Sequence, residues 1–136
     1  MRSVDEGLFS TQVFGGDTPD AGFFTWDMPE NILYADGALA DLFGVDPEEA
    51  ERGLPIETYL DRVHPEDRSQ LAKAISDSII AHMNQQETYR VLNSQGSYVT
   101  VASFGRGFRD RDGLPQRYVG IVVPVSEGEP EPVRLS

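Results

Sequence analysis

The sequence predicts an α+β fold in which four helices are inserted into an antiparallel sheet of five strands. Two short runs of strand-forming residues come first, at residues 22–27 and 31–35. Three longer runs, at residues 87–92, 97–109 and 116–123, follow one another with strong turn signals between them. Residues 36–83, between the two groups, carry apolar side chains at helical spacing. The helices are therefore expected between the second and third strands.

The two short runs surround the turn-prone sequence Met28-Pro-Glu and are predicted to form a hairpin. Residues 1–20 precede it. They include Val4, Leu8 and Val13 and end in a run typical of a linker, Gly15-Gly-Asp-Thr-Pro-Asp. This N-terminal segment is a candidate cover for one face of the sheet.

The helical region begins with two short helices whose ends are marked by capping residues. Asp36 is a suitable N-cap for the first, and Gly44 is placed to end it. Asp46 is the N-cap expected for the second, because Pro47 suits the first helical position and Glu49 completes a capping box.

A third apolar stripe is followed by the longest predicted helix, residues 65–83. Pro65 opens this helix, and Glu66 and Asp67 lie in its first turn, where the helix dipole favours negative charge. His64, just before it, is expected to cap or pack locally. His82 is predicted to lie on the inward stripe of the helix. The third stripe consists of Ile56, Tyr59, Leu60 and Val63.

The three long runs predict a meander. Asn93-Ser-Gln-Gly and Asp110-Arg-Asp-Gly are the turns. In the run at 97–109, alternation places Val101 and Ser103 on one face and Phe104 on the other. Neither face is plainly polar, so one can line a core or cavity and the other needs a cover. The last run is almost continuously apolar, which predicts a central strand buried on both faces. Gly105, Gly107 and Gly120 indicate bends or close approach to the backbone.

Composition limits the class of protein. The chain of 136 residues is long enough for one domain. No apolar run reaches the length of a membrane span, and the N-terminus lacks the apolar region of a signal peptide, so we expect no membrane partner and a cytoplasmic location. The net charge of −12 argues against nucleic acid as a partner. The absence of cysteine excludes disulfides, thiolate metal sites and a cysteine nucleophile.

The sequence resembles the PAS domain family in the order of its elements and in several phrases. These phrases are Leu42-Phe-Gly with Asp46-Pro-Glu-Glu, Val63-His-Pro-Glu-Asp-Arg, Tyr89-Arg-Val, Gly105-Arg-Gly-Phe-Arg-Asp and Tyr118-Val-Gly-Ile. The resemblance covers residues 21–125. We therefore expect three parts: residues 1–20 as a flanking segment that covers a dimer, residues 21–126 as a PAS domain, and residues 127–136 as a disordered acidic tail or linker.

The resemblance implies a five-stranded sheet in the spatial order 2-1-5-4-3 with helices packed on one face. It also implies a sensory module of bacterial signalling rather than an enzyme. Such a module senses or relays a signal through a small ligand, a homodimer or both. It passes the signal to a histidine kinase or another regulator. The cofactor stays unknown. Photosensors of this superfamily form a flavin adduct with a cysteine, and this chain has none.

Four residues are candidates for contact with a cofactor, and each has a structural alternative. His82 resembles in position the haem-binding histidines of some PAS domains, although we expect a hydrogen-bonded or exposed histidine and no haem. Trp26 could stack on a flat ligand or pack in the core or a dimer contact. Arg90 could bind a carboxylate or be solvated or ion-paired. Ser103 faces the possible cavity. We expect no catalytic residue and no metal site.

Two other functions stay open. The first is a docking or dimerisation domain with a filled core and no ligand. The second is a small cone-shaped enzyme of the isomerase type, which also wraps helices on a curved sheet. That enzyme class needs a polar pocket with an acid or base, and its helices precede most of its sheet. Here two strands come first, so this alternative ranks last.

Overall fold

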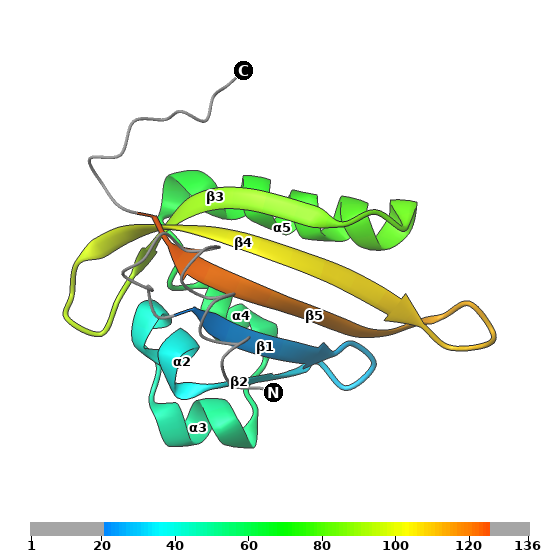
Figure 1. Ribbon diagram of the computed structural model, residues 1–136, viewed down its shortest axis with the longest axis horizontal. Helices are drawn as coiled ribbons and strands as arrows, with labels where there is room; N and C mark the ends of the chain where they lie inside the picture. The colour runs from blue at the N-terminus through cyan, green and yellow to red at the C-terminus, as the bar shows by residue number, and fades with distance from the viewer. Residues whose placement is uncertain (1–20, 126–136) are drawn as a thin grey trace, which may run out of the picture.

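The computed structural model describes residues 21–125, which form one antiparallel sheet with four helices on one of its faces (Figure 1). The predicted N-terminal cover, residues 1–20, and the predicted acidic tail, residues 127–136, lie outside the described residues. The elements are β1 (Gly22–Asp27), β2 (Ile32–Ala35), α2 (Gly37–Phe43), α3 (Pro47–Arg52), α4 (Ile56–Leu60), α5 (Pro65–Ala81), β3 (Gln85–Leu92), β4 (Tyr98–Arg109) and β5 (Pro115–Pro124).

The strand order across the sheet is β2-β1-β5-β4-β3, which confirms the predicted topology. Strand β5 pairs with β1 on one side and with β4 on the other, and all pairs are antiparallel. The central strand is therefore the last in sequence. The β1-β2 hairpin and the β3-β4-β5 meander meet along β1 and β5, so the chain must pass through all four helices before the sheet can close.

The short helices begin and end where their capping residues predicted. The side chain of Asp36 accepts a hydrogen bond from the backbone N–H of Leu39 at 3.0 Å, and that of Asp46 accepts one from Glu49 at 3.0 Å. Gly44 ends α2 in the left-handed conformation, with φ of 63°. These local signals were sufficient to predict the boundaries of α2 and the start of α3.

The long helix α5 is shorter than the sequence predicts. It ends at Ala81, and His82 is its C-cap with φ of 60°. His82 is consequently exposed and does not lie on an inward stripe, which corrects the prediction. The reason is local: the backbone N–H groups of His82 and Met83 both bond to the carbonyl of Ser78, which is the pattern of a helix that ends in a left-handed residue.

The core lies between the helices and the inner face of the sheet. Leu39, Tyr59, Val101 and Val122 are among its buried members. The outer face of the central strand β5 is different: Val119, Ile121 and Val123 are only partly buried by residues 21–125. The prediction that this strand is buried on both faces is therefore wrong for the described residues, because all four helices pack on the inner face.

Candidate functional site

A small cavity lies inside the core, between the helices and the inner face of the sheet. Its volume is about 50 Å³, and its walls are formed mainly by apolar side chains from β1, β2, α2, α4, α5 and the three long strands. We call it the core cavity. Five polar side chains with hydroxyl or amide groups also line it: Tyr59, Gln85, Tyr89, Ser103 and Tyr118.

Three of these polar side chains belong to one buried hydrogen-bond network on the sheet side of the cavity. The Gln85 amide nitrogen donates to Ser103 Oγ at 3.1 Å. The Tyr118 hydroxyl donates to Gln85 Oε1 at 3.4 Å and lies 3.1 Å from Ser78 Oγ. Ser78 in turn donates to the carbonyl of Ile75 within α5. The network therefore joins α5 to β3, β4 and β5, and its polar groups already have partners in the protein.

Tyr118 is held in place by its neighbours on the sheet. Its ring stacks on Phe24 with centroids 6.3 Å apart and meets Trp26 edge-on at 6.2 Å. The ring also lies directly over Gly105, where a Cβ atom would collide with it. The predicted close approach at Gly105 is thus confirmed. The absent side chain makes room for a tyrosine whose hydroxyl reaches the network.

Tyr59 differs from the other polar residues of the core cavity. Its side chain is 3% exposed, and its hydroxyl has no hydrogen-bond partner among residues 21–125. Burial raises the pKa of Tyr59 to about 12, so the hydroxyl is neutral at any ordinary pH. A buried hydroxyl without a partner costs about 1–3 kcal/mol. A molecule in the cavity that hydrogen-bonds to Tyr59 would recover part of this energy.

The chemistry of the cavity suits a small neutral molecule. No side chain that is charged at neutral pH is among its lining residues. A charged ligand would lose its hydration there without gaining an ion pair. Haem and flavin are many times larger than a cavity of about 50 Å³.

Of the four residues predicted to contact a cofactor, only Ser103 lines the core cavity. Trp26 packs against the core, and its indole N–H donates to Asn31 Oδ1 at 2.9 Å, which agrees with the alternative of a core residue. Sequence reasoning missed Gln85 and did not single out Tyr59 as a site residue. Tyr59 was expected on an apolar stripe, and a hydroxyl in such a stripe is the signal that could have identified it.

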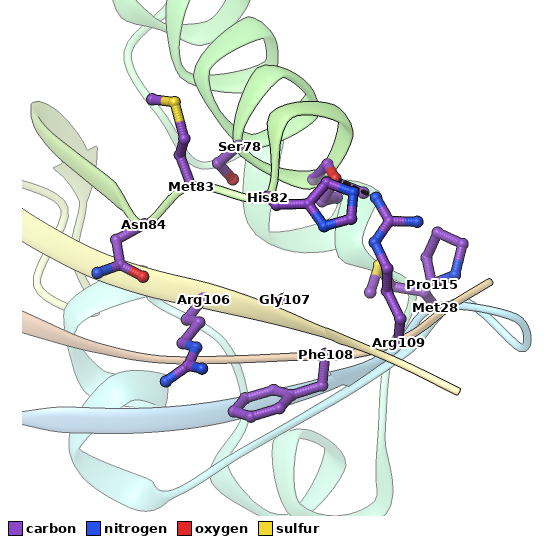
Figure 2. Close-up of a pocket in the computed structure, with 11 residues that line it drawn as sticks. Met28, Ser78, His82, Met83, Asn84, Arg106, Gly107, Phe108, Arg109 and Pro115 are labelled. Carbon is purple, nitrogen blue, oxygen red and sulfur yellow. Dashed lines mark hydrogen bonds between the residues drawn. The ribbon is translucent and has the colours of Figure 1, made fainter. Parts of the chain in front are cut away.

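His82 lies elsewhere, in an open groove of about 310 Å³ between the end of α5 and the end of β4. Figure 2 shows its imidazole beside the guanidinium of Arg109, which donates to the carbonyl of Ile79. Arg106 also lines this groove, and its guanidinium lies 4.9 Å from the centre of the Phe108 ring. We call this hollow the edge groove. It shares no lining residue with the core cavity.

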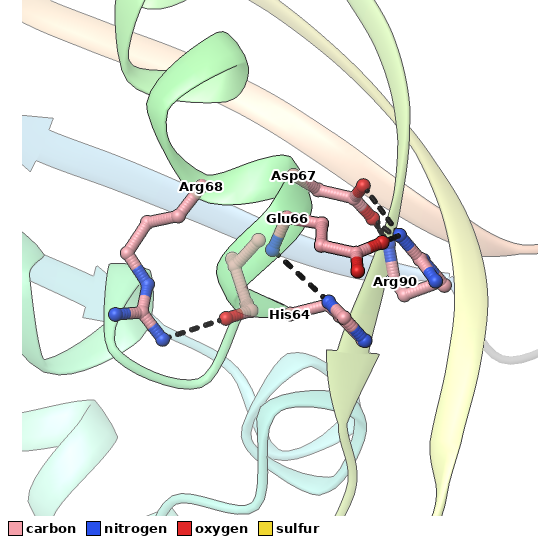
Figure 3. Close-up of polar contacts among 6 residues, drawn as sticks. His64, Glu66, Asp67, Arg68 and Arg90 are labelled. Carbon is pink, nitrogen blue, oxygen red and sulfur yellow. Dashed lines mark hydrogen bonds and ion pairs between the residues drawn. The ribbon is translucent and has the colours of Figure 1, made fainter.

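Arg90 is in an ion pair at the start of α5 (Figure 3). Its guanidinium donates to both carboxylate oxygens of Asp67, at 2.8 and 2.9 Å, and reaches Glu66 at 3.3 Å. The hydrogen bonds from Arg90 lower the pKa of Asp67 to about 2. The alternative of an ion-paired arginine is confirmed. The two carboxylates therefore do more than complement the helix dipole, because they tie α5 to β3.

His64 caps the same helix. Its Nδ1 atom accepts a hydrogen bond from the backbone N–H of Glu66 at 3.1 Å, as the prediction of a local cap requires. Among the described residues, no group of three or more His, Cys, Asp or Glu side chains is placed to hold a metal ion. None of the helices within residues 21–125 is long and apolar enough to cross a membrane.

The model of the PAS fold family matches residues 32–122 of this chain. Among solved structures, the chain is similar to the N-terminal domain of a diguanylate cyclase with PAS/PAC sensor from Marinobacter aquaeolei, with 20% identity, coverage of 78% of this chain and 95% of that one, and a TM-score of 0.69. It is also similar to a sensory box histidine kinase/response regulator from Burkholderia thailandensis, with 20% identity, coverage of 88% and 84%, and a TM-score of 0.68.

A third similar structure is the Cycle PAS-B domain of Drosophila melanogaster with bound ethylene glycol, with 16% identity, coverage of 76% and 99%, and a TM-score of 0.62. No match was found among curated proteins.

Proposed function

The chain belongs to the PAS fold family, and from this premise we propose that it is a signal-sensing module that responds to a small neutral molecule in the core cavity. The observation that carries the proposal is the hydroxyl of Tyr59, which is buried against this cavity without a partner in residues 21–125. The side chains of Gln85, Ser103 and Tyr118 are bonded within the protein, whereas the buried hydroxyl of Tyr59 is left to recognise a ligand.

The volume of the cavity sets the size of the molecule. An apolar cavity of about 150 Å³ admits benzene, so one of about 50 Å³ suits roughly two to four non-hydrogen atoms. Ethylene glycol, bound in the Cycle PAS-B structure, is of this size. One hydroxyl or carbonyl group would meet Tyr59, and an apolar remainder would meet the other walls. Short alcohols and ketones fit this description.

Binding would be transmitted through elements on both sides of the cavity. Tyr59 belongs to α4, and the network around Tyr118 joins α5 to the strands. A ligand that bonds to Tyr59 would couple α4 to this network. Solved structures from a diguanylate cyclase and a histidine kinase are among those to which this chain is similar, and we expect the signal of this module to pass to a regulator of that kind rather than to any chemistry of its own.

The test compares 1-propanol and xenon as probes of the full-length chain by NMR. Both should shift amide resonances of cavity residues such as Val122 and Leu39. In Tyr59→Phe the response to xenon should persist, while the affinity for 1-propanol should fall about 5- to 10-fold, since a net hydrogen bond is worth about 1 kcal/mol. Tyr34→Phe, on the exposed face of β2, is the matched control.

Absence of any response to both probes would refute the proposal. Native mass spectrometry of freshly purified protein gives an independent measurement, because it detects any small molecule that the chain retains and its oligomeric state.

A second function, homodimerisation, is favoured by the outer face of the sheet. Phe23, Ile121 and Phe104 are neighbours in one cross-strand row, since Ile121 pairs with both of the others. Phe23 is 56% exposed and Phe104 is 40% exposed. Exposed apolar rows of this kind mark interfaces in soluble proteins. We therefore propose that a second copy covers this face, with residues 1–20 contributing to the contact.

Sedimentation of the full-length chain tests this second function. Phe104→Glu should shift a dimer to a monomer, and Thr88→Glu, an exposed position on the same face near the sheet edge, should not. Deletion of residues 1–16 should also weaken the dimer. A monomer at tens of micromolar in every case would contradict the proposal.

A further inference from the structure

Strand β4 extends beyond the strand beside it, which leaves part of its edge open. Strand β3 begins at Gln85, opposite Gly105. Strand β4 continues to Arg109 and pairs with β5 along this extension. Within residues 21–125, the stretch 106–109 of β4 therefore has no strand neighbour on the side of β3.

The backbone at this open edge can pair with another strand. The N–H of Val125 donates to the carbonyl of Thr100 at 2.9 Å, so the polar backbone groups of Thr100 face β5. Backbone groups alternate between the two edges of a strand, and the register of β4 with β5 is unbroken from Val101 to Phe108. The N–H and C=O of Gly107 must then face the open side. An unpaired edge of this kind is a template for an added strand.

The space around the edge suits the side chains of such a strand. The edge groove of about 310 Å³ lies on the helix side of β4. A second hollow, of about 350 Å³, is lined by Phe104, Arg106 and Val119 on the outer face. Both hollows share Asn84 and Arg106 as lining residues. Side chains of a strand alternate between the two faces of a sheet, so an added strand would send them into both hollows.

The charge around the edge selects the partner. The ionisable side chains that line the two hollows are Arg106, Arg109 and His82, and none is acidic. This is unusual in a chain with 23 acidic and 11 basic residues. Two copies that paired through this same edge would bring their own arginines together, which like-charge repulsion opposes. An acidic strand would instead be attracted by the arginines at this edge.

We propose that the open edge of β4 binds the acidic run of residues 127–132 from a second copy of this chain. The run Glu-Gly-Glu-Pro-Glu-Pro carries its carboxylates at alternate positions. In an extended conformation, Glu129 and Glu131 present N–H and C=O groups along one edge, while Pro130 and Pro132 fall on the other edge, where no hydrogen bond is needed. One edge of this strand can pair with Gly107. The other edge carries the prolines and cannot pair with a further strand, so the sheet ends there.

The pairing also places the carboxylates near positive charge. Residues that face each other across a hydrogen-bonded pair carry their side chains on the same face of the sheet. Gly107 belongs to the inner parity of β4, which is the side of Arg109 and His82 in Figure 2. Glu129 and Glu131 would therefore point toward these two residues, and the prolines toward Phe108 on the outer face.

The same run cannot reach the groove of its own chain. Gly107 lies opposite Tyr118, and Val125 lies seven positions after Tyr118, a distance of about 23 Å at about 3.3 Å per residue. Glu129 is four positions after Val125 and Glu131 is six, so they reach at most about 14 Å and about 21 Å from it. The carboxylates must therefore come from another copy.

The experiment uses the chain with Glu127, Glu129 and Glu131 changed to Gln, so that these residues of one copy do not compete with the peptide for the groove of another copy. A fluorescent peptide with the sequence of residues 124–136 is titrated into it. We expect saturable binding that weakens as salt is added. In the saturated complex, hydrogen exchange of the Gly107 amide should slow at least about tenfold.

Matched variants separate the effect on binding of positive charge at the open edge from the effect of the net charge of the chain. Arg106→Glu should weaken binding about tenfold or more, and Arg52→Glu, in α3 away from the groove, should change it less than about twofold. A peptide of the same composition with its two prolines adjacent should also bind weakly, because one proline then falls on each edge.

Three results would overturn the proposal: equal effects of Arg106→Glu and Arg52→Glu, equal binding of the rearranged peptide, or a Gly107 amide that the peptide leaves unchanged. A Gly107 amide already protected before peptide is added would mean that another segment occupies the edge, and would also refute it. Phe23→Glu, in the outer-face row but outside both hollows, should leave peptide binding intact, which separates this contact from the dimer through the outer face.

Discussion

Replacement of Gly105 by alanine should destabilise the protein, whereas the same change at Gly107 should not. The two glycines lie on the same strand and face the same side of the sheet. A Cβ atom at Gly105 would collide with the ring of Tyr118, which is 1% exposed and cannot move outward. A Cβ atom at Gly107 would meet the same ring at 3.6 Å, an ordinary contact distance.

The magnitude follows from this geometry. Overpacking of a core costs about 1–3 kcal/mol. Displacement of the ring would also disturb the contacts of its hydroxyl with Ser78 and Gln85, at about 1 kcal/mol for a hydrogen bond. The loss of glycine flexibility in the unfolded chain returns about 0.4–1 kcal/mol. Gly105→Ala should therefore lower the free energy of unfolding by about 1–3 kcal/mol, and Gly107→Ala should raise it by up to about 1 kcal/mol.

Urea denaturation followed by the fluorescence of Trp26 measures both changes, since this indole contacts Tyr118. The midpoint should move down for Gly105→Ala and slightly up for Gly107→Ala, with unchanged slopes. Adding Tyr118→Leu should make the alanine at position 105 nearly harmless, because the ring that it strikes is gone. Equal midpoints for the two alanine variants would refute the reasoning about Tyr118.

Three other predictions follow from the site. The pKa of Asp67 is about 2 in the folded protein and 3.8 ordinarily, so its pairing with Arg90 stabilises the fold above about pH 4, and this contribution is lost as the pH falls toward 2. The stability of Asp67→Asn should lack this dependence on pH. The same loss of stability with acid in Asp67→Asn and in the unchanged protein would contradict the prediction. In the absence of ligand, Tyr59→Phe should raise the free energy of unfolding, measured in urea, by up to about 1 kcal/mol, because it removes a buried hydroxyl that has no partner in residues 21–125. A decrease of more than about 1 kcal/mol in the free energy of unfolding would show instead that the hydroxyl has a hydrogen-bond partner. Hemin should give no saturable Soret band, since His82 is exposed at a helix end; a band lost in His82→Ala would overturn this view.

The local patterns of the sequence predicted most of the fold. Asp36, Gly44 and Asp46 marked helix ends because a cap depends on a few neighbouring residues. Alternation in β4 placed Val101 and Ser103 on one face, and in the structure this is the inner face, where both are buried. The end of α5 was predicted two residues too late, because the left-handed conformation of His82 is uncommon for a residue other than glycine and leaves no mark in apolar spacing.

The candidate site was decided by the tertiary structure. Tyr59 and Ser103 are 44 positions apart in the sequence, and only the packing of α4 on the sheet makes them walls of one cavity. The open edge at Gly107 exists because β3 begins at Gln85, a relation between two strands that neither strand carries alone. The sequence by itself therefore determined which residues form helices and strands and which faces are apolar, since these follow from interactions between near neighbours. A cavity, a buried hydroxyl without a partner and an open strand edge each depend on how distant segments pack together. They therefore arise only when the whole sheet and its helices are in place.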